Sequence, residues 1–203
     1  MAQSLMPEPE TIIPLPDAIA PATQVRSTLI QSSLKQLKAS GHFDAYERRL
    51  PDSMRAEILD TLAPTWLGMD VAMAHYQACD ELQLTAAELM RIGEAVGKLI
   101  NNVLLSALAR AAKLTGITPW QFYGQLGRVW SRAFQGGAVG LSRTGAAESL
   151  IDIRGLPLCR FEYFRYGCCG VFTSIAALAA SRATTTIVDY STDALRLRGT
   201  WKL

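Results

Sequence analysis

The sequence contains few of the residues and motifs on which enzymes depend. Only two histidines, His42 and His75, occur among its 203 residues. No G-x-S-x-G, H-E-x-x-H or glycine-rich phosphate-binding motif is present, and no pair of carboxylates lies within an apolar run. These absences remove the common arrangements for acyl transfer, metal-assisted hydrolysis and phosphoryl transfer. We therefore predict that the protein is not an enzyme and has no catalytic residues.

Cysteine is scarce and is not arranged to bind a structural metal. The four cysteines, Cys79, Cys159, Cys168 and Cys169, include no C-x-x-C pair, which argues against zinc and against thioredoxin-like redox chemistry. Adjacent Cys168 and Cys169 leave open a strained redox pair or a lipid acceptor, although small buried thiols are the simpler interpretation. No metal site is predicted.

Long hydrophobic runs are also missing. The longest uncharged apolar run, residues 167–181, lies between Arg165 and Arg182. It is shorter than the roughly 20 residues that a bilayer requires. Residues 1–21 have no basic cluster before an apolar segment, unlike a secretory signal. We therefore expect a cytoplasmic protein with no membrane span and with reduced thiols.

Charged residues make up 19% of the chain, and their distribution is uneven. Residues 1–101 carry a net charge of −5 and residues 102–203 a net charge of +7, within a formal total of +2. The two halves should attract each other, or the opposite half of a partner. The arginines of the second half are dispersed rather than aligned on one helix, so no nucleic-acid partner is predicted. They include Arg154, Arg160, Arg165, Arg196 and Arg198.

A chain of this length fits one domain whose core needs no disulfides. Five prolines between residues 7 and 21 predict that residues 1–22 form an extended or disordered tail, or a strap over the domain. Proline lacks an amide donor and disfavours helix in the residue before it. Residues 23–203 are then a single α+β domain.

Apolar residues at helical spacing predict five or six helices before residue 135. The predicted helical segments are residues 23–40, 43–50, 53–62, 70–80, 85–116 and 119–134. Thr85 and Glu88 form a capping-box pattern at the start of the longest helix, and Pro119 suits the first turn of the last. Gly93 and Gly97 lie four residues apart in the longest helix, and tight packing against a neighbouring helix should explain them.

Beyond residue 137 the pattern changes to short alternating stretches, which are typical of strands. The predicted strands are residues 138–143, 148–154, 184–190 and 195–201, with a helix over residues 159–181 between the two hairpins. Leu150 and either Ile151 or Ile153 are expected to face the core. The fold class is therefore α+β, with a helical N-terminal part packed on a small C-terminal antiparallel sheet of about four strands.

Most of the chain, residues 24–201, resembles a paralogous family of unknown function that is expanded in myxobacteria. The matching segments are Ser33-Leu-Lys-Gln-Leu37, Thr65-Trp-Leu67, Ala74-His-Tyr-Gln-Ala-Cys-Asp80, Gly116-Ile-Thr-Pro-Trp120 and the Gly136-Gly137 corner. More distantly, the C-terminal third is similar to the superfamily of vinyl-reductase-type phenol sensors, haem-nitric-oxide-binding domains and subunits of the transport-particle (TRAPP) tethering complex. Residues 156–170 occupy the place of the segment that leads into that superfamily's glycine-containing helix. The resemblance implies a small-ligand cavity between helices and sheet, or a dimerisation face.

Two departures limit what the resemblance implies. The phenol sensors of the superfamily hold zinc through cysteines in and after the penultimate strand, whereas residues 184–201 contain no cysteine. The haem-binding members use a Tyr-x-Ser-x-Arg motif for the haem propionates, and this chain has no such string. The resemblance therefore implies the superfamily's architecture. It implies neither a zinc site made of those cysteines nor a haem held through the Tyr-x-Ser-x-Arg motif.

We predict a non-enzymatic sensory or regulatory domain, used in bacterial signalling, that binds an apolar small molecule or a protein partner. No cofactor is predicted. The residues expected to bind the ligand are mostly aromatic, and their placement in an ordinary core is the competing interpretation. They are Trp66, His75, Trp120, Phe122, Trp130, Phe164, Arg165 and Tyr166.

Two other hypotheses stay open. The charge asymmetry and the long helix allow a self-associating scaffold, a homodimer with Gly93 and Gly97 at its interface. Alternatively, His75 can supply the single axial ligand that a haem requires, which would make the protein a gas sensor. His75 and Cys79 lie one helical turn apart, but no third or fourth zinc ligand accompanies them.

Overall fold

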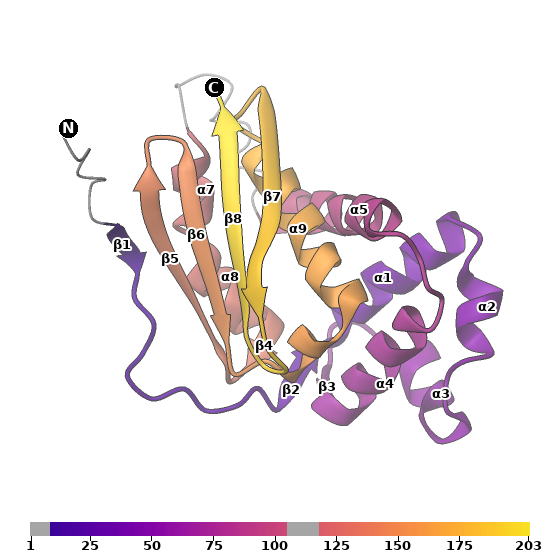
Figure 1. The fold of residues 1–203 in the computed structure, drawn as a ribbon. Helices are drawn as coiled ribbons and strands as arrows, with labels where there is room; N and C mark the ends of the chain where they lie inside the picture. The colour runs from indigo at the N-terminus through magenta and orange to yellow at the C-terminus, as the bar shows by residue number, and fades with distance from the viewer. Residues whose placement is uncertain (1–8, 105–117) are drawn as a thin grey trace, which may run out of the picture.

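The structure, a computed structural model, describes residues 9–104 and 118–203, with side chains described for residues 9–98 and 118–203. The chain forms a five-stranded sheet. Figure 1 shows that this sheet is twisted and has helices packed on one face, with a group of helices from the first half of the chain beside it. A second sheet of three short strands lies between these two parts. The α+β class predicted from the sequence is confirmed.

The large sheet has the strand order β1-β5-β6-β8-β7 and is antiparallel throughout. Its strands are β1 (Glu10–Ile13), β5 (Ala138–Gly145), β6 (Glu148–Arg154), β7 (Arg182–Tyr190) and β8 (Leu195–Lys202). Four of these strands are the two predicted hairpins. The fifth, β1, adds a strand to the prediction, because four residues among prolines carry too short a pattern to identify.

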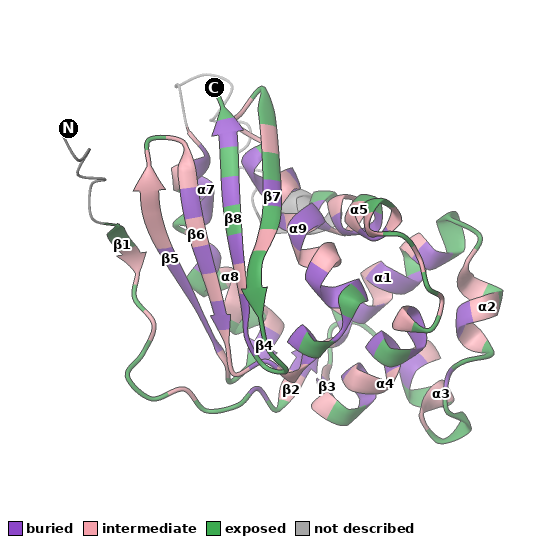
Figure 2. Cartoon of the chain, in the orientation of Figure 1, coloured by how far each residue is buried: buried purple, intermediate pink, exposed green. Residues whose placement is uncertain are grey.

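Side chains alternate between the two faces of the sheet, as Figure 2 shows along β6 and β8. Ile151 and Ile153 are buried beneath the helices, whereas Leu150 is only partly buried. The prediction that Leu150 faces the core is therefore wrong, and Ile151 and Ile153 both take that position. Three of four consecutive residues in this strand are apolar, so the alternation has no unique phase in the sequence.

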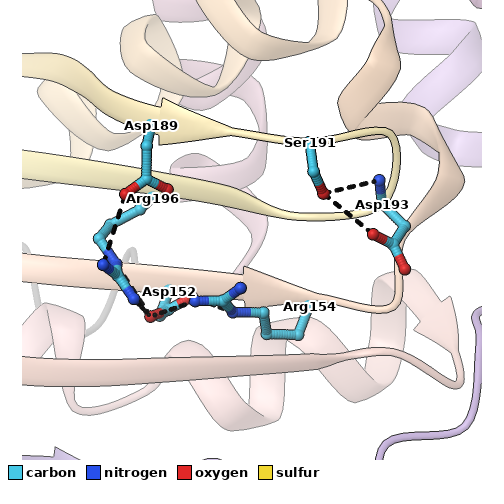
Figure 3. A network of polar contacts seen from close by, with 6 residues as sticks. All are labelled: Asp152, Arg154, Asp189, Ser191, Asp193 and Arg196. Carbon is cyan, nitrogen blue, oxygen red and sulfur yellow. Dashed lines mark hydrogen bonds and ion pairs between the residues drawn. The ribbon is translucent and has the colours of Figure 1, made fainter.

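The opposite face of the sheet carries charges that are paired with one another (Figure 3). Asp152 accepts hydrogen bonds from Nε and Nη2 of Arg196, at 3.1 and 2.9 Å, and from Nη2 of Arg154, at 3.2 Å. A second carboxylate, Asp189, lies 3.4 Å from Nη1 of Arg196. Exposed ion pairs contribute about 0–1 kcal/mol each. Two of the arginines considered for a basic face are thus neutralised by neighbouring carboxylates.

The first four helices of the chain form a group beside the small sheet (Figure 1). The helices are α1 (Ser27–Ala39), α2 (Phe43–Glu47), α3 (Asp52–Leu59) and α4 (Met69–Asp80), and the strands are β2 (Gln24–Arg26), β3 (Trp66–Gly68) and β4 (Phe134–Gln135). The buried stripe of α1 contains Ile30, Leu34 and Leu37 at helical spacing. The predicted helix over residues 23–40 begins at Ser27 instead, because residues 24–26 pair with both β3 and β4.

Helix α5 (Ala86–Leu104) crosses helix α9 (Glu162–Ala176) at backbone contact distance. A Cβ atom added at Gly93 would lie 2.1 Å from the carbonyl oxygen of Gly167, and one added at Gly170 would lie 2.1 Å from that of Met90. One added at Gly97 would lie 2.1 Å from Oγ of Ser174. The prediction that tight helix packing explains Gly93 and Gly97 is confirmed. The close approach is made to α9 of the same chain, rather than to a second copy.

The capping box predicted at Thr85 and Glu88 is confirmed, and the helix start predicted from Pro119 carries a second capping box that was not predicted. The amide of Thr85 donates to Oε2 of Glu88 at 2.9 Å before α5, and the amide of Thr118 donates to Oε1 of Gln121 at 2.9 Å before α7 (Pro119–Tyr123). The predicted helix over residues 119–134 is divided into α7 and α8 (Leu126–Ala133). The predicted end of the long helix at Gly116 lies outside the described residues.

The segment before α9 is a short 3₁₀-helix, Pro157–Arg160. The predicted helix over residues 159–181 is therefore shorter, because α9 begins only at Glu162. Asp80, the last residue of α4, caps this start: its two carboxylate oxygens accept the amides of Glu162 and Tyr163, at 2.9 and 2.6 Å. A carboxylate at a helix N-terminus satisfies free amides and complements the helix dipole.

The described part of the predicted tail lies on the large sheet. Strand β1 pairs with β5, and Leu15 approaches Gly140, where an added Cβ would lie 2.9 Å from Cγ of the leucine. Further along, the amide of Ala22 donates to the carbonyl of Gly155 at 2.7 Å. Residues 9–22 thus form a strand and an extended segment.

Among the described residues, no helix is both long enough and apolar enough to cross a membrane. Within the same part of the chain, no three His, Cys, Asp or Glu side chains are grouped so that they could hold a metal ion.

The α5–α9 crossing predicts that alanine substitutions at two glycines of α9, one turn apart, have opposite effects on the stability of the fold. Gly170→Ala is expected to destabilise the fold by about 1–3 kcal/mol, the usual cost of overpacking, because its methyl group would meet backbone atoms of Met90 and Glu94. Gly167→Ala is the matched control, since its methyl group would meet no atom within 4 Å. Alanine is favoured over glycine in a helix by about 0.5–1 kcal/mol. Urea unfolding measures both, and equal midpoints would contradict the backbone contact.

Candidate functional site

A cavity of about 140 Å³ lies between the helices and the large sheet. Its wall is apolar except for a few hydroxyl and thiol groups, and it is built by α1, α4, α5, α8, α9 and strands β4, β5 and β6. The described lining residues are Leu29, Ser33, Tyr76, Ile92, Gly93, Val96, Leu126, Val129, Trp130, Ala133, Phe134, Val139, Ile153, Tyr163, Phe164, Gly167, Cys168, Val171, Phe172 and Ile175.

The position of the cavity follows from the sheet alternation and from the glycines at the helix crossing. Val139 and Ile153 are paired inward-facing residues of β5 and β6, and they form the floor. Gly93 and Gly167 form part of the wall and contribute no side chain. A Cβ atom at Gly167 would meet nothing within 4 Å. The helices therefore touch at their backbones and leave space beside the contact.

A chain of buried hydrogen bonds reaches the cavity from α2 and α4. Tyr46 Oη lies 2.6 Å from Nδ1 of His75, and Nε2 of His75 lies 3.1 Å from Oγ of Ser33. Ser33 Oγ in turn lies 2.7 Å from Oη of Tyr163. Tyr46 and His75 are completely buried, and the last two members, Ser33 and Tyr163, line the cavity.

Burial keeps the members of this network neutral. It lowers the pKa of His75 from 6.5 to about 3, because a charged imidazole is unfavourable away from water. It raises the pKa of both Tyr46 and Tyr163, and also that of Cys79, whose sulfur lies 3.7 Å from Nε2 of His75. The hydroxyl, thiol and imidazole groups beside the cavity thus act as neutral hydrogen-bonding groups rather than as acids, bases or nucleophiles.

Two of the eight residues predicted to bind a ligand line the cavity. Trp130 lines it from α8 while its Nε1 donates to the carbonyl of Gly136 at 3.2 Å, and Phe164 lines it from α9. His75 does not line the cavity, but it contacts Ser33, which does.

The other five predicted residues do not line the cavity. The Trp66 ring stacks under Arg26, with the guanidinium carbon 4.1 Å from the ring centroid. Trp120 and Phe122 belong to α7, where the Trp120 ring packs against Trp201 with centroids 4.8 Å apart. Arg165 donates through Nη1 to the carbonyls of residues 159 and 160, and Tyr166 packs against the edge of the core without lining the cavity.

Sequence reasoning missed Ser33, Tyr76 and Tyr163 as site residues. Ser33 carried a usable signal, because it lies between Ile30 and Leu34 on the buried stripe of α1. A polar side chain on the apolar stripe of a helix indicates a buried hydrogen-bond partner.

The adjacent cysteines carry no sign of redox function. Both thiols are free. Burial raises the pKa of Cys168 well above 9 and that of Cys169 to about 12, so the reactive thiolate form is disfavoured. They serve here as small residues of α9.

Comparison with known proteins gives a clear result for the fold alone. No family model matches the chain, and no curated protein matches it, so membership of the myxobacterial family stays a prediction. Solved structures of H-NOX (haem-nitric-oxide-binding) domains do match. One is the Fe(II) unliganded H-NOX protein from K. algicida, with a TM-score of 0.62 at 9% identity over 88% of this chain and 97% of that one.

Two further H-NOX structures agree. An oxygen-binding H-NOX domain related to soluble guanylate cyclases has a TM-score of 0.59 at 12% identity, covering 87% of this chain and 95% of its own. A mutant form of T. tengcongensis H-NOX has a TM-score of 0.60 at 11% identity, covering 87% and 97%. The protein therefore has the H-NOX fold, as the more distant of the two resemblances implied.

The residues of this chain do not fit a haem. An axial ligand is usually histidine, cysteine thiolate, methionine or tyrosine. Both ring nitrogens of His75 are hydrogen-bonded, and His42 lies outside the cavity. Tyr76, Tyr163 and Cys168 do line the cavity, but burial raises the pKa of each side chain and disfavours the deprotonated form that would bind iron. Residues 99–117 contain none of the four ligand types. The cavity of about 140 Å³ is also below the roughly 300–1,000 Å³ of pockets for drug-sized ligands, and a haem is at least that large.

The buried histidine predicts a specific dependence of stability on pH. The unfolded chain binds a proton at His75 near pH 6.5, whereas the folded protein does so only at about pH 3. The contribution of the neutral ring to the free energy of unfolding therefore has its full value above pH 6.5 and is lost as the pH falls toward 3.

Between pH 7 and pH 5 this loss is expected to be about 2 kcal/mol. Urea unfolding at the two pH values, for the wild type and for His75→Gln, measures it as the difference between the two proteins. The variant should lose about 2 kcal/mol less than the wild type. An identical pH dependence would show that His75 is not the buried neutral group.

Proposed function

We propose that the protein is a non-enzymatic sensory domain that binds a small apolar molecule in the cavity beside the α5–α9 crossing. The observation that carries the proposal is the cavity itself, about 140 Å³ with an apolar wall, between the helices and the large sheet. Protein interiors are close-packed and contain few voids larger than a water molecule. An apolar cavity of about 150 Å³ stays dry and accepts benzene or xenon. The ligand is therefore expected to be of that size.

The chemistry of the wall supports binding rather than catalysis. None of the described lining residues carries a carboxylate, an imidazole, an amino group or a guanidinium. The hydroxyls and thiols present are held neutral by burial, as Tyr76 and Cys168 illustrate. General acid–base and nucleophilic mechanisms need a group whose pKa is tuned toward the working pH.

The position of the cavity supports a sensory role. Its wall combines α1 and α4 of the first half with α9 and the sheet of the second half, so that a ligand contacts both parts. A ligand shifts a conformational equilibrium only by its difference in affinity for the two states. Solved proteins of the same fold include an oxygen-binding domain related to soluble guanylate cyclases. A homodimer, a protein partner in signalling and a cytoplasmic location remain part of this proposal.

Toluene is a suitable first probe, and its binding should raise the melting temperature. At a concentration 100 times its Kd, a ligand stabilises the folded state by about 2.7 kcal/mol, which corresponds to roughly 5–10 °C for a domain of this size. Differential scanning calorimetry with increasing toluene measures the shift.

Gly167→Leu fills the cavity and is expected to abolish the toluene effect, because its side chain would extend into space that is free of protein atoms. Gly127→Leu is the matched control: this glycine is exposed in α8, is also free of neighbours within 4 Å, and does not line the cavity. A wild type that gains no stability from toluene, or a Gly167→Leu variant that gains as much as the wild type, would exclude this cavity as the site.

Haem binding gives a second test that separates this protein from other proteins of its fold. Hemin added to the purified protein under reducing conditions is expected to give the absorption of free haem, because burial keeps the Tyr76, Tyr163 and Cys168 side chains at the cavity protonated and both ring nitrogens of His75 are hydrogen-bonded. A sharp Soret band that is lost in His75→Gln would show that the chain does bind haem through His75, and it would restore the gas-sensor alternative.

A further inference from the structure

The wall of the cavity contains a tyrosine hydroxyl that has no hydrogen-bond partner among the described residues. Tyr76 is 7% exposed and lines the cavity, and its hydroxyl forms no hydrogen bond with any described residue. Its ring is fixed by edge contacts with the rings of His75, Tyr163 and Phe164, at centroid distances of 5.0, 6.0 and 5.4 Å. Burial raises its pKa, so the hydroxyl keeps its hydrogen. A buried tyrosine O–H usually finds an acceptor.

The buried network supplies a second donor at the same wall. Neutral His75 carries one N–H. Tyr46 is completely buried, and its hydroxyl has a ring nitrogen of His75 as its one hydrogen-bond partner among the described residues. Its O–H must therefore donate to Nδ1, which puts the imidazole hydrogen on Nε2 and directs it to Ser33. Ser33 Oγ, which accepts this hydrogen, lies 2.7 Å from Oη of Tyr163, and when the serine donates to that oxygen the Tyr163 hydrogen is the last in the chain.

The acceptors available for these two hydrogens are weak. The Tyr163 hydroxyl lies beside the thiol of Cys79, and Tyr76 lies near Cys168, and thiol sulfur is a weak acceptor. No described lining side chain offers a carboxylate, an amide or an imidazole. The polar part of the wall therefore has hydrogens to donate and no strong acceptor among the described side chains that line it.

On the basis of the proposed function, we propose that the ligand carries a hydrogen-bond acceptor, the carbonyl oxygen of a small apolar ketone, which receives the O–H groups of Tyr76 and Tyr163. A carbonyl oxygen has two lone pairs and can accept from both. The rest of the ligand lies against the aliphatic and aromatic wall. An anionic acceptor is disfavoured, because no cationic side chain lines the described wall and an unpaired buried charge is costly.

Cyclohexanone and methylenecyclohexane make a matched pair of probes, since they have nearly the same shape and differ in C=O against C=CH₂. Isothermal titration calorimetry of both probes is carried out with the wild type, Tyr76→Phe and Tyr163→Phe. Each variant is expected to bind cyclohexanone about tenfold more weakly while its affinity for methylenecyclohexane is unchanged. Infrared spectroscopy of bound cyclohexanone should show the carbonyl stretch moving to higher frequency in each variant, because a hydrogen bond has been removed.

Tyr123→Phe is the matched control, because it removes a buried hydroxyl of the same core that does not line the cavity and that donates to the carbonyl of Phe172 at 3.2 Å. It should change the affinity for neither probe. Binding of methylenecyclohexane also reports that each variant is folded.

The outcomes separate the two proposals. If neither probe binds the wild type, the proposed function fails. If both probes bind, and Tyr76→Phe and Tyr163→Phe weaken them equally or not at all, the cavity binds ligands but the acceptor assignment is overturned. If only one of the two variants loses affinity for cyclohexanone, that tyrosine alone donates to the carbonyl. The proposal that both tyrosines donate to it is then overturned.

Discussion

The backbone contact between α5 and α9 is the constraint on which the rest of the structure depends. Gly93 and Gly170 let the two helices touch without side chains between them. Helix α9 is thereby held between α5 and the sheet, and it is long enough to present Tyr163 at one end of the cavity and Ile175 at the other. A larger residue at the crossing would separate the helices. Gly93, which takes part in this contact, also lines the cavity together with Gly167, and neither contributes a side chain to fill it.

Local signals in the sequence predicted much of this fold. The Thr85–Glu88 capping box, the proline at the start of α7 and the two hairpins are all present, because each depends on residues close together in the chain. The phase of β6 could not be predicted, since Leu150 and Ile151 are equally apolar and only the helices above the sheet decide which is buried. The short strands β1 to β4 depend on pairing between distant segments and have no local pattern of their own.

The candidate site was harder to predict than the fold. The ligand-binding residues were predicted mainly because they are aromatic. This criterion included Trp130 and Phe164, which line the cavity, but also Trp66 and Trp120, which pack elsewhere. The polar groups of the site come from three separate helices, and Ser33 and Tyr163 are 130 residues apart in the chain. A single sequence has no signal that joins such residues. The fold of H-NOX domains is retained here, although the side chains around the cavity do not suit the cofactor that those domains contain.

The cap formed by Asp80 has a mechanical consequence. Helix α4 ends in the carboxylate that holds the first amides of α9, and one turn earlier the same helix presents Tyr76 to the cavity. A rotation of α4 about its axis would therefore pull on the beginning of α9, and through α9 on the edge of the large sheet. The wall of the cavity and the beginning of α9 are thus joined through the last turn of a single helix.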